Sequence, residues 1–264
     1  VGNPDFTLFN SCVRITIIGI AIGNFITIHV SSITNGGLLH GISIVMPLVI
    51  FSRQFLPSIF PITVFIRDDD NRIAIEYRAK VDKPCPVNLT NHAYFNLDGN
   101  QCDVRNHRLQ ILADEYLPVD GMGIPYQGLK EVSGTSFDFR SVKTIAQDFL
   151  SDDDQRKVKG YDHAFLLQAK GDVTQPAAQV WSADEKLQMT VYTTAPALQF
   201  YSGNYLGGTT AREHEEYSDW QGLALESEFL PDSPNHPEWP QPDCVLRPGE
   251  EYVSVTEYHF IPHS

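Results

Sequence analysis

The chain has 264 residues and a formal net charge of −14. This acidic balance argues against a nucleic-acid partner, because proteins that bind phosphate backbones need a basic surface. The length fits one large β domain or two smaller ones, and it is sufficient to bury a core. A neutral small molecule is the ligand that fits such a chain best.

Four cysteines occur, at Cys12, Cys85, Cys102 and Cys244. Their wide spacing indicates neither a zinc site nor a disulfide framework, so we expect free thiols in a reducing compartment. The N-terminal residues lack the charged stretch and the small-residue cleavage site of a secretory signal. These features together predict a cytoplasmic protein.

Residues 1–66 differ in composition from the rest of the chain. They contain 14 isoleucines but only three charged residues, Asp5, Arg14 and Arg53. The apolar run Leu38–Phe51 is interrupted by a histidine, a glycine and a proline. It therefore falls short of the roughly 18 to 20 apolar residues that a membrane-spanning helix needs. We expect buried strands here and no membrane partner.

From Phe65 onward, apolar and polar residues alternate in short segments that are bounded by turn residues. The segment Arg72–Lys80 follows an acidic turn and alternates throughout, and the same period recurs in Lys186–Thr193 and Tyr252–Phe260. A period of two is typical of half-buried strands. Only Thr144–Leu150 has helical spacing, and it is short. The pattern predicts an all-β fold with many strands and long loops.

The run Val87–Leu97 sets a histidine among polar residues. If the run is a strand, Asn88, Thr90, His92 and Tyr94 share one face, because side chains alternate along a strand. A row of amide, hydroxyl, imidazole and phenol groups is more typical of a pocket wall than of a core. A lone histidine on a strand is more often structural, so the run alone makes His92 a candidate and no more.

A second candidate is the carboxylate of Glu226. In the run from Leu223 to Glu228, Leu223 and Leu225 face one way, whereas Ala224, Glu226 and Glu228 face the other. Partial burial of a glutamate on such a strand raises its pKa and suits it to accept a proton near neutral pH. A surface glutamate is the competing interpretation.

The segment Pro231–Asp243 contains five prolines. Proline fixes φ and removes a backbone donor, so we expect an extended, rigid surface connection. A simple connector is one interpretation. The other is the rim of a pocket, with Trp239 available to stack on a sugar ring.

Four motifs occur together and in order. They are VNLTNHAYFNLDG, KVKGYDHAFLL, PALQFYSGNYLGG and LALESEFLPDSPNHPEWPQPDCVLRPGEEY. On these residues the sequence resembles the aldose 1-epimerase (galactose mutarotase) family. The resemblance extends from about Arg67 to Phe260 and implies one domain over residues 1–264, built as a large antiparallel β-sandwich with a sugar site across one sheet.

The resemblance implies roles for the two candidates. Glu226 in LALESEF matches the family's general base, and His92 in TNHAYFNL matches its general acid. Glu226 would take the proton of the sugar's O1 hydroxyl while His92 protonates the ring oxygen, so the ring opens to the aldehyde. Rotation about C1–C2 and reclosure then give the other anomer.

The remaining site residues also follow from the resemblance. Asp162 in GYDH is expected to accept a hydrogen bond from a sugar hydroxyl, and Gln199 in QFYSGN is expected to line the same site. Asn91 is assigned to substrate binding, and His40 in LLHGI matches a second family histidine. The implied substrates are the monosaccharides galactose and glucose, and neither a metal nor an organic cofactor is expected.

The N-terminal quarter departs from the family pattern. The family has arginines that bind sugar hydroxyls ahead of its LHGG motif, and Asn24 and Ile28 stand there in this chain. Two explanations remain open. Either residues 1–66 have diverged, which would weaken sugar binding, or the sequence of this part is truncated or frame-shifted.

These residues are compatible with three functions. The first is an aldose 1-epimerase acting on galactose and on glucose. The second is a carbohydrate-binding protein of the same fold without turnover, which the absent arginines favour. The third is a glycosidase, which would require a second carboxylate about 5 to 10 Å from Glu226. The presence of both Glu226 and His92 favours the epimerase.

Overall fold

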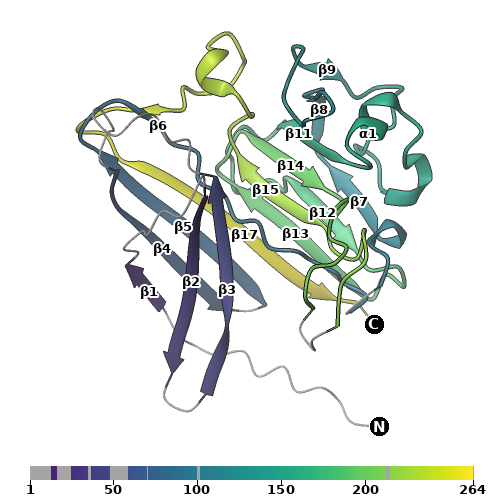
Figure 1. Ribbon diagram of the computed structural model, residues 1–264, viewed down its shortest axis with the longest axis horizontal. Helices are drawn as coiled ribbons and strands as arrows, with labels where there is room; N and C mark the ends of the chain where they lie inside the picture. Colours follow the sequence, from purple (N-terminus) through teal and green to yellow (C-terminus); the bar gives the residue numbers. More distant parts are fainter. Residues whose placement is uncertain are drawn as a thin grey trace.

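The computed structural model describes residues 13–16, 25–34, 37–47, 59–69, 71–99, 102–211 and 215–263, with side chains described from residue 71 onward. Strands and long loops make up almost all of this part of the chain, as the alternating segments predict (Figure 1). Two large antiparallel sheets dominate the architecture. The prediction of an all-β fold is confirmed.

The larger sheet has eight strands, and each neighbouring pair is antiparallel. The C-terminal strand β17 (Tyr252–Pro262) lies inside this sheet, since it pairs with β5 (Arg72–Val81) on one side and with β13 (Leu187–Thr193) on the other. In sheet order the strands are β1 (Val13–Thr16), β4 (Ile59–Asp69), β5 (Arg72–Val81), β17 (Tyr252–Pro262), β13 (Leu187–Thr193), β12 (Ala178–Trp181), β7 (Arg108–Ile111) and β10 (Lys143–Thr144).

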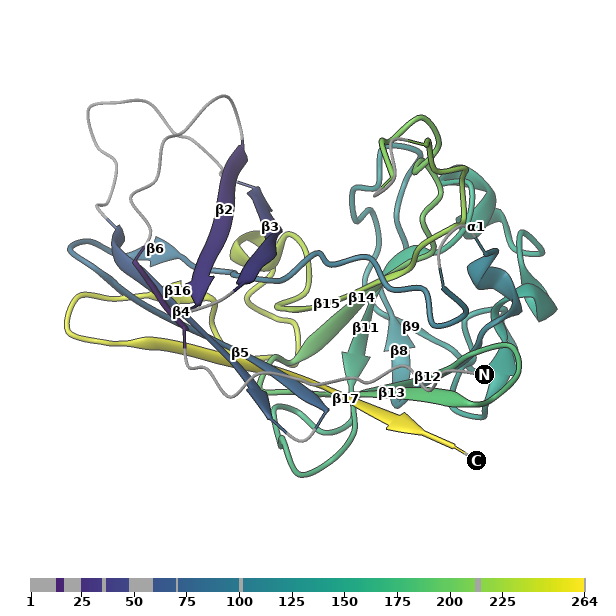
Figure 2. The same cartoon turned by 90° about the horizontal axis from the view of Figure 1, so that it is seen from below.

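The second sheet has five antiparallel strands. Figure 2 shows this sheet and a separate hairpin on the same side of the larger sheet. In order, the strands of the second sheet are β15 (Ala224–Glu228), β14 (Ala197–Tyr201), β11 (Asp162–Leu167), β8 (Ala113–Tyr116) and β9 (Lys130–Glu131). The hairpin consists of β2 (Phe25–Thr34) and β3 (Gly37–Pro47), and β6 (Cys85–Pro86) pairs with β16 (Val245–Leu246).

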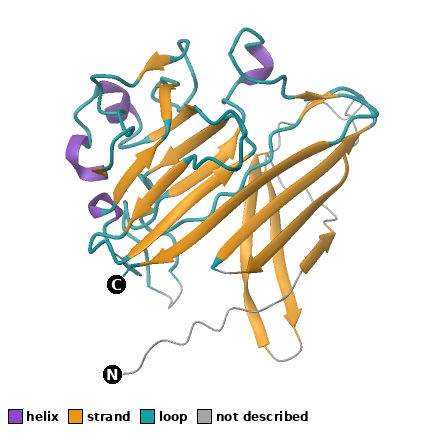
Figure 3. Ribbon diagram, turned by 180° about the vertical axis from the view of Figure 1, so that it is seen from behind, coloured by secondary structure: helices purple, strands orange, loops and turns teal. Residues whose placement is uncertain are grey.

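The described helices are short and lie outside the sheets (Figure 3). They are the 3₁₀ helices η1 (Val104–Asn106), η2 (Ile145–Asp148) and η3 (Ser233–Asn235) and the α-helix α1 (Asp153–Lys157). The helix expected near Thr144–Leu150 is therefore η2. None of the helices in the described ranges is long and apolar enough to cross a membrane.

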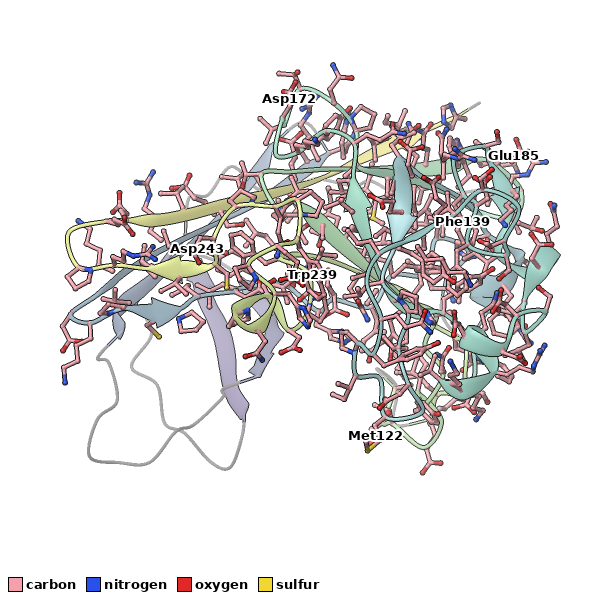
Figure 4. All side chains as sticks on the ribbon, turned by 90° about the horizontal axis from the view of Figure 1, so that it is seen from above. Met122, Phe139, Asp172, Glu185, Trp239 and Asp243 are labelled. Carbon is pink, nitrogen blue, oxygen red and sulfur yellow. The ribbon has the colours of Figure 1, made fainter. Side chains whose placement is uncertain are left out.

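The hydrophobic core lies between the two sheets. Met189 of β13 and Val180 of β12 face Phe165 of β11 and Phe200 of β14, and all four are at most 1% exposed. Phe139, which is labelled within the dense side chains of Figure 4, packs edge-on against Phe200. Truncation of a buried phenylalanine such as Phe200 to alanine costs about 3–5 kcal/mol of unfolding free energy. This core holds β14 rigidly from behind.

The strand expected over Val87–Leu97 is wrong. The segment is irregular and forms one isolated bridge, between Phe95 and Leu223. The side-chain amide of Asn88 replaces a ladder, because its Oδ1 accepts from the Phe229 N–H at 2.9 Å and its Nδ2 donates to the Phe229 carbonyl at 3.2 Å. An asparagine side chain can imitate a peptide group in this way. The alternation of residues along the segment does not reveal that side-chain hydrogen bonds replace strand pairing.

Candidate active site

The candidate site lies on the face of the five-stranded sheet that points away from the core. Gln199 of β14 is paired with Glu226 of β15, and Asp162 of β11 is paired with Tyr201 of β14. Because side chains alternate, Leu198, Phe200 and Leu225 enter the core, and these four residues take the opposite face. The strand register thus places a carboxylate, an amide, a phenol and a second carboxylate side by side.

His92 reaches this face from the irregular segment beside β15. The bridge between Phe95 and Leu223 fixes that segment just before β15 begins, with backbone hydrogen bonds of 2.8 and 2.9 Å in the two directions. The Nε2 atom of His92 lies 3.4 Å from Oε1 of Glu226. Their side chains are 30% and 13% exposed, so the pair is largely shielded but open to a ligand.

The electrostatic environment of the pair favours its uncharged forms. Burial raises the pKa of Glu226 well above its usual range, and the negative charges of Glu228 and Asp162 raise that pKa further. Burial lowers the pKa of His92. The two shifts bring the proton affinities of a carboxylate and an imidazole closer together, which suits proton exchange through a bound hydroxyl. The pKa shift expected for Glu226 from its strand position has the predicted direction.

Asp162 and Gln199 form a second polar pair beside the first. The Gln199 amide Nε2 donates to Oδ1 of Asp162 at 2.7 Å. Burial raises the pKa of Asp162, and this hydrogen bond opposes the rise. The buried Oε1 atom of Gln199 has no hydrogen-bond partner among the described residues. An unpaired buried acceptor is energetically costly, so this atom favours a donor, such as a ligand hydroxyl, that comes within reach.

Asp162 is held in place from inside the core by its chain neighbour. His163 is fully buried, and its Nδ1 accepts the backbone N–H of Asp162 at 3.0 Å. Burial lowers the pKa of His163 to about 3, so its ring is neutral at physiological pH. A neutral ring with an unprotonated Nδ1 is the form that this hydrogen bond requires.

Two tyrosines surround His92. The ring of Tyr94 lies 5.0 Å from the imidazole between centroids, and the ring of Tyr201 lies 6.0 Å from it. Tyr94 is half exposed. Its Cβ packs closely on Gly222, because a Cβ added to that glycine would lie 3.2 Å from the Cβ of Tyr94. Tyr201 was missed as a site residue, although the alternation of β14 places it on the same face as Gln199.

Two other expected site residues are not brought into this cluster. Asn91 is 4% exposed, and its amide donates at 3.1 Å to the Tyr258 hydroxyl, which in turn donates to the Leu225 carbonyl at 3.2 Å. It lies between the sheets, behind β15, because the chain at Asn91 turns its side chain toward β17. His40 belongs to β3, but its side chain lies outside the described part of the structure, as does Asn24.

Trp239 does not offer an exposed ring for sugar stacking, and that hypothesis is wrong. Trp239 is only 7% exposed and packs with Leu230, Ala197 and neighbouring apolar residues. His236 stacks on its ring with centroids 4.2 Å apart and planes 7° apart. The proline-rich segment therefore covers one end of the outer face of the five-stranded sheet. Trp239 is labelled near the middle of Figure 4.

Within the described ranges, no group of three or more histidine, cysteine, aspartate or glutamate side chains is arranged to hold a metal ion. The described site is instead a set of hydrogen-bonding groups on one sheet face. These groups are Asp162, Gln199 and Glu226 from the strands, His92 and Tyr94 from the irregular segment, and Tyr201 at the end of β14.

Residues 61–259 match the family model described as aldose 1-epimerase. The aldose 1-epimerase of Escherichia coli strain K12 is 81% identical over 193 residues, which cover 73% of this chain and 56% of that protein. The galactose mutarotase of Homo sapiens is 38% identical over 197 residues, covering 73% and 55%. This chain thus spans a little over half the length of these curated relatives.

The fold is also similar to solved structures. An aldose epimerase homologue from C. elegans superposes with a TM-score of 0.68 at 26% identity, over 95% of this chain and 69% of that chain. The expected sandwich architecture is confirmed by this similarity and by the two described sheets.

Proposed function

Because the chain belongs to the aldose 1-epimerase family, we propose that it interconverts the α and β anomers of an aldose. D-galactose is the proposed substrate and D-glucose a second one. The observation that carries this proposal is the 3.4 Å contact between His92 and Glu226 on an accessible sheet face. Such a contact places an acid and a base within reach of one sugar ring.

Glu226 is the proposed general base and His92 the proposed general acid. The carboxylate removes the proton from O1 while the imidazolium protonates the ring oxygen, so the bond between C1 and the ring oxygen breaks and an aldehyde forms. After rotation about C1–C2, the ring oxygen returns its proton to His92 and attacks the other face of C1. Glu226 then protonates O1, and the pair ends in its starting protonation state.

This cycle requires one proton on the pair at the outset. The working condition is therefore a pH at which the pair holds this single proton, and it lies between the acid and alkaline limbs of the rate profile. Burial raises the pKa of Glu226 and lowers that of His92, so it disfavours the charged arrangement that starts the cycle. Each positioned group contributes about 10²- to 10⁴-fold to the rate.

Asp162 and Gln199 are the proposed substrate-positioning residues. Asp162 accepts from a sugar hydroxyl, and Gln199 both orients Asp162 and offers its free Oε1. Hydrogen bonds to a charged group contribute about 1.5–3 kcal/mol each. His40 and Asn91 stay as proposed contributors, with Asn91 acting from beneath the face through Tyr258.

The second candidate is a sugar-binding protein without turnover, which Ile28 in place of an expected arginine favours. Polarimetry of freshly dissolved α-D-galactose, with calorimetry of sugar binding alongside, separates the two. The epimerase proposal predicts that rotation changes faster than in buffer. Binding without any acceleration would establish the second candidate.

We also propose a cytoplasmic location. All three cysteines in the described ranges, Cys85, Cys102 and Cys244, are free thiols. Free thiols are typical of a reducing compartment. Alkylation of the cysteines by a thiol reagent before and after reduction, on protein isolated from its cell, tests this location; equal labelling is expected.

A further inference from the structure

Glu228 is a second carboxylate on the face that carries Glu226. The two residues are separated by Ser227, which is 3% exposed and turns toward the core. Same-face positions two residues apart on a strand lie about 6.6 Å from each other. At this separation the charge of one carboxylate affects the ionisation of the other.

Few groups compensate the charge of Glu228. Asn88 is its hydrogen-bond partner, with Nδ2 3.5 Å from Oε2, and the Asn88 amide is itself fixed by the Phe229 backbone. Glu228 and Tyr252 of β17 both line one small groove at the surface. The negative charge of Asp162 on β11 raises the pKa of Glu228. Among the residues whose side chains the structure describes, no lysine or arginine forms an ion pair with either glutamate, and His92 is the one basic group that contacts Glu226.

We infer that Glu228 is a positioning residue for the proposed reaction: it titrates together with Glu226 and thereby sets the pH range in which Glu226 can act as a base. This inference rests on the proposed function. Two carboxylates that share a low-dielectric face lose their protons in coupled steps, because the second negative charge is repelled by the first. The ionisation of Glu226 therefore depends on the state of Glu228.

The titration behaviour of both groups agrees with this placement. Burial, followed by the charge of Asp162, raises the pKa of Glu228 to about 8. Burial raises the pKa of Glu226 most. The charge of Glu228 raises that pKa further, by more than the charge of Asp162 does. At about 6.6 Å and an effective dielectric constant of about 20, removal of one unit charge displaces a neighbouring titration by roughly one to two pH units.

The test compares the wild type with Glu228→Gln and Glu228→Asp. Glutamine keeps the shape and the contact with Asn88 but removes the charge, whereas aspartate keeps the charge. We expect the acid limb of the pH profile of kcat/KM, measured by polarimetry with α-D-galactose, to move one to two units lower in Glu228→Gln. The limb should stay within about half a unit of the wild type in Glu228→Asp. Glu131→Gln, at an exposed position of β9, is the control and should not move the limb.

An independent measurement separates failure of this inference from failure of the proposed function. NMR titration of the side-chain carboxyl carbon of Glu226 reports its ionisation without any turnover. A lower midpoint in Glu228→Gln than in the wild type supports the coupling even if the wild type shows no mutarotation. An unchanged midpoint, or an unchanged acid limb in an active protein, overturns the role of Glu228.

Discussion

His92 and Glu226 meet at 3.4 Å although they come from different parts of the chain. The strand register places Glu226 beside Gln199, and the bridge between Phe95 and Leu223 places His92 beside β15. One short contact thus depends on both the five-stranded sheet and an irregular segment.

Replacement of Glu226 by glutamine should lower kcat by about 10²- to 10⁴-fold, because the amide cannot accept the O1 proton. Stability should not fall, since the substitution removes a largely buried carboxylate whose pKa is already raised. Polarimetry measures the rate, and thermal unfolding followed by circular dichroism checks the fold. Turnover close to that of the wild type would show that another group is the base.

The rate losses caused by His92→Asn and Glu226→Gln should not be additive. Each single variant should lose most of the rate, and the double variant should be little slower than the slower single one, because groups that act as a unit give non-additive losses. Kinetic measurement of all four proteins gives the coupling. Multiplicative losses in the double variant would mean that the two side chains act independently.

Gln199→Ala should raise KM more than it lowers kcat. The substitution removes the 2.7 Å hydrogen bond to Asp162 and the free Oε1 acceptor, so the pKa of Asp162 should rise further and the sugar should lose contacts. A loss of about 1.5–3 kcal/mol corresponds to a roughly 10- to 150-fold weaker substrate affinity. Gln221→Ala, in the loop before β15, is the control. An unchanged KM in Gln199→Ala would remove Gln199 from the binding site.

The sequence predicted the strands and the facing of Glu226 well. The strands β5, β13 and β17 coincide with the alternating segments, because half-buried strands leave a local period of two. Leu225 enters the core and Glu226 takes the other face, as that period requires. These features depend only on neighbouring residues.

Features that depend on distant partners could not be predicted in this way. The segment with His92 is irregular because Asn88 bonds to Phe229, and Trp239 is buried because His236 and the sheet face cover it. Glu228 was seen on the face of Glu226, but its coupling to Asp162 requires the register of three strands. Alternation along one segment contains none of this information.

The contribution of His163 to the stability of the protein should be lost in acid. Burial holds the pKa of His163 at about 3, well below the ordinary histidine value of about 6.5. A depressed pKa means that the unfolded state binds the proton more readily, so the stabilisation is present above pH 6.5 and is lost as the pH falls toward 3. Urea denaturation between pH 8 and pH 4 measures this loss.

His163→Phe is the matching variant, since it fills the ring volume but has no titrating nitrogen. We expect its unfolding free energy to be lower by about 1–3 kcal/mol at pH 8, because the N–H of Asp162 loses its acceptor. We also expect a weaker dependence on pH than in the wild type. If the unfolding free energy depends on pH equally in both proteins, His163 is not the group that causes the loss of stability in acid.

The proposed reaction opens and recloses an aldose ring through Glu226 and His92. Magnetisation-transfer NMR on an equilibrated solution of D-galactose measures exchange between the α and β anomeric protons directly. We expect exchange that grows in proportion to protein concentration and disappears in Glu226→Gln. Exchange equal to that in buffer, in a folded protein to which calorimetry shows galactose bound, would contradict it.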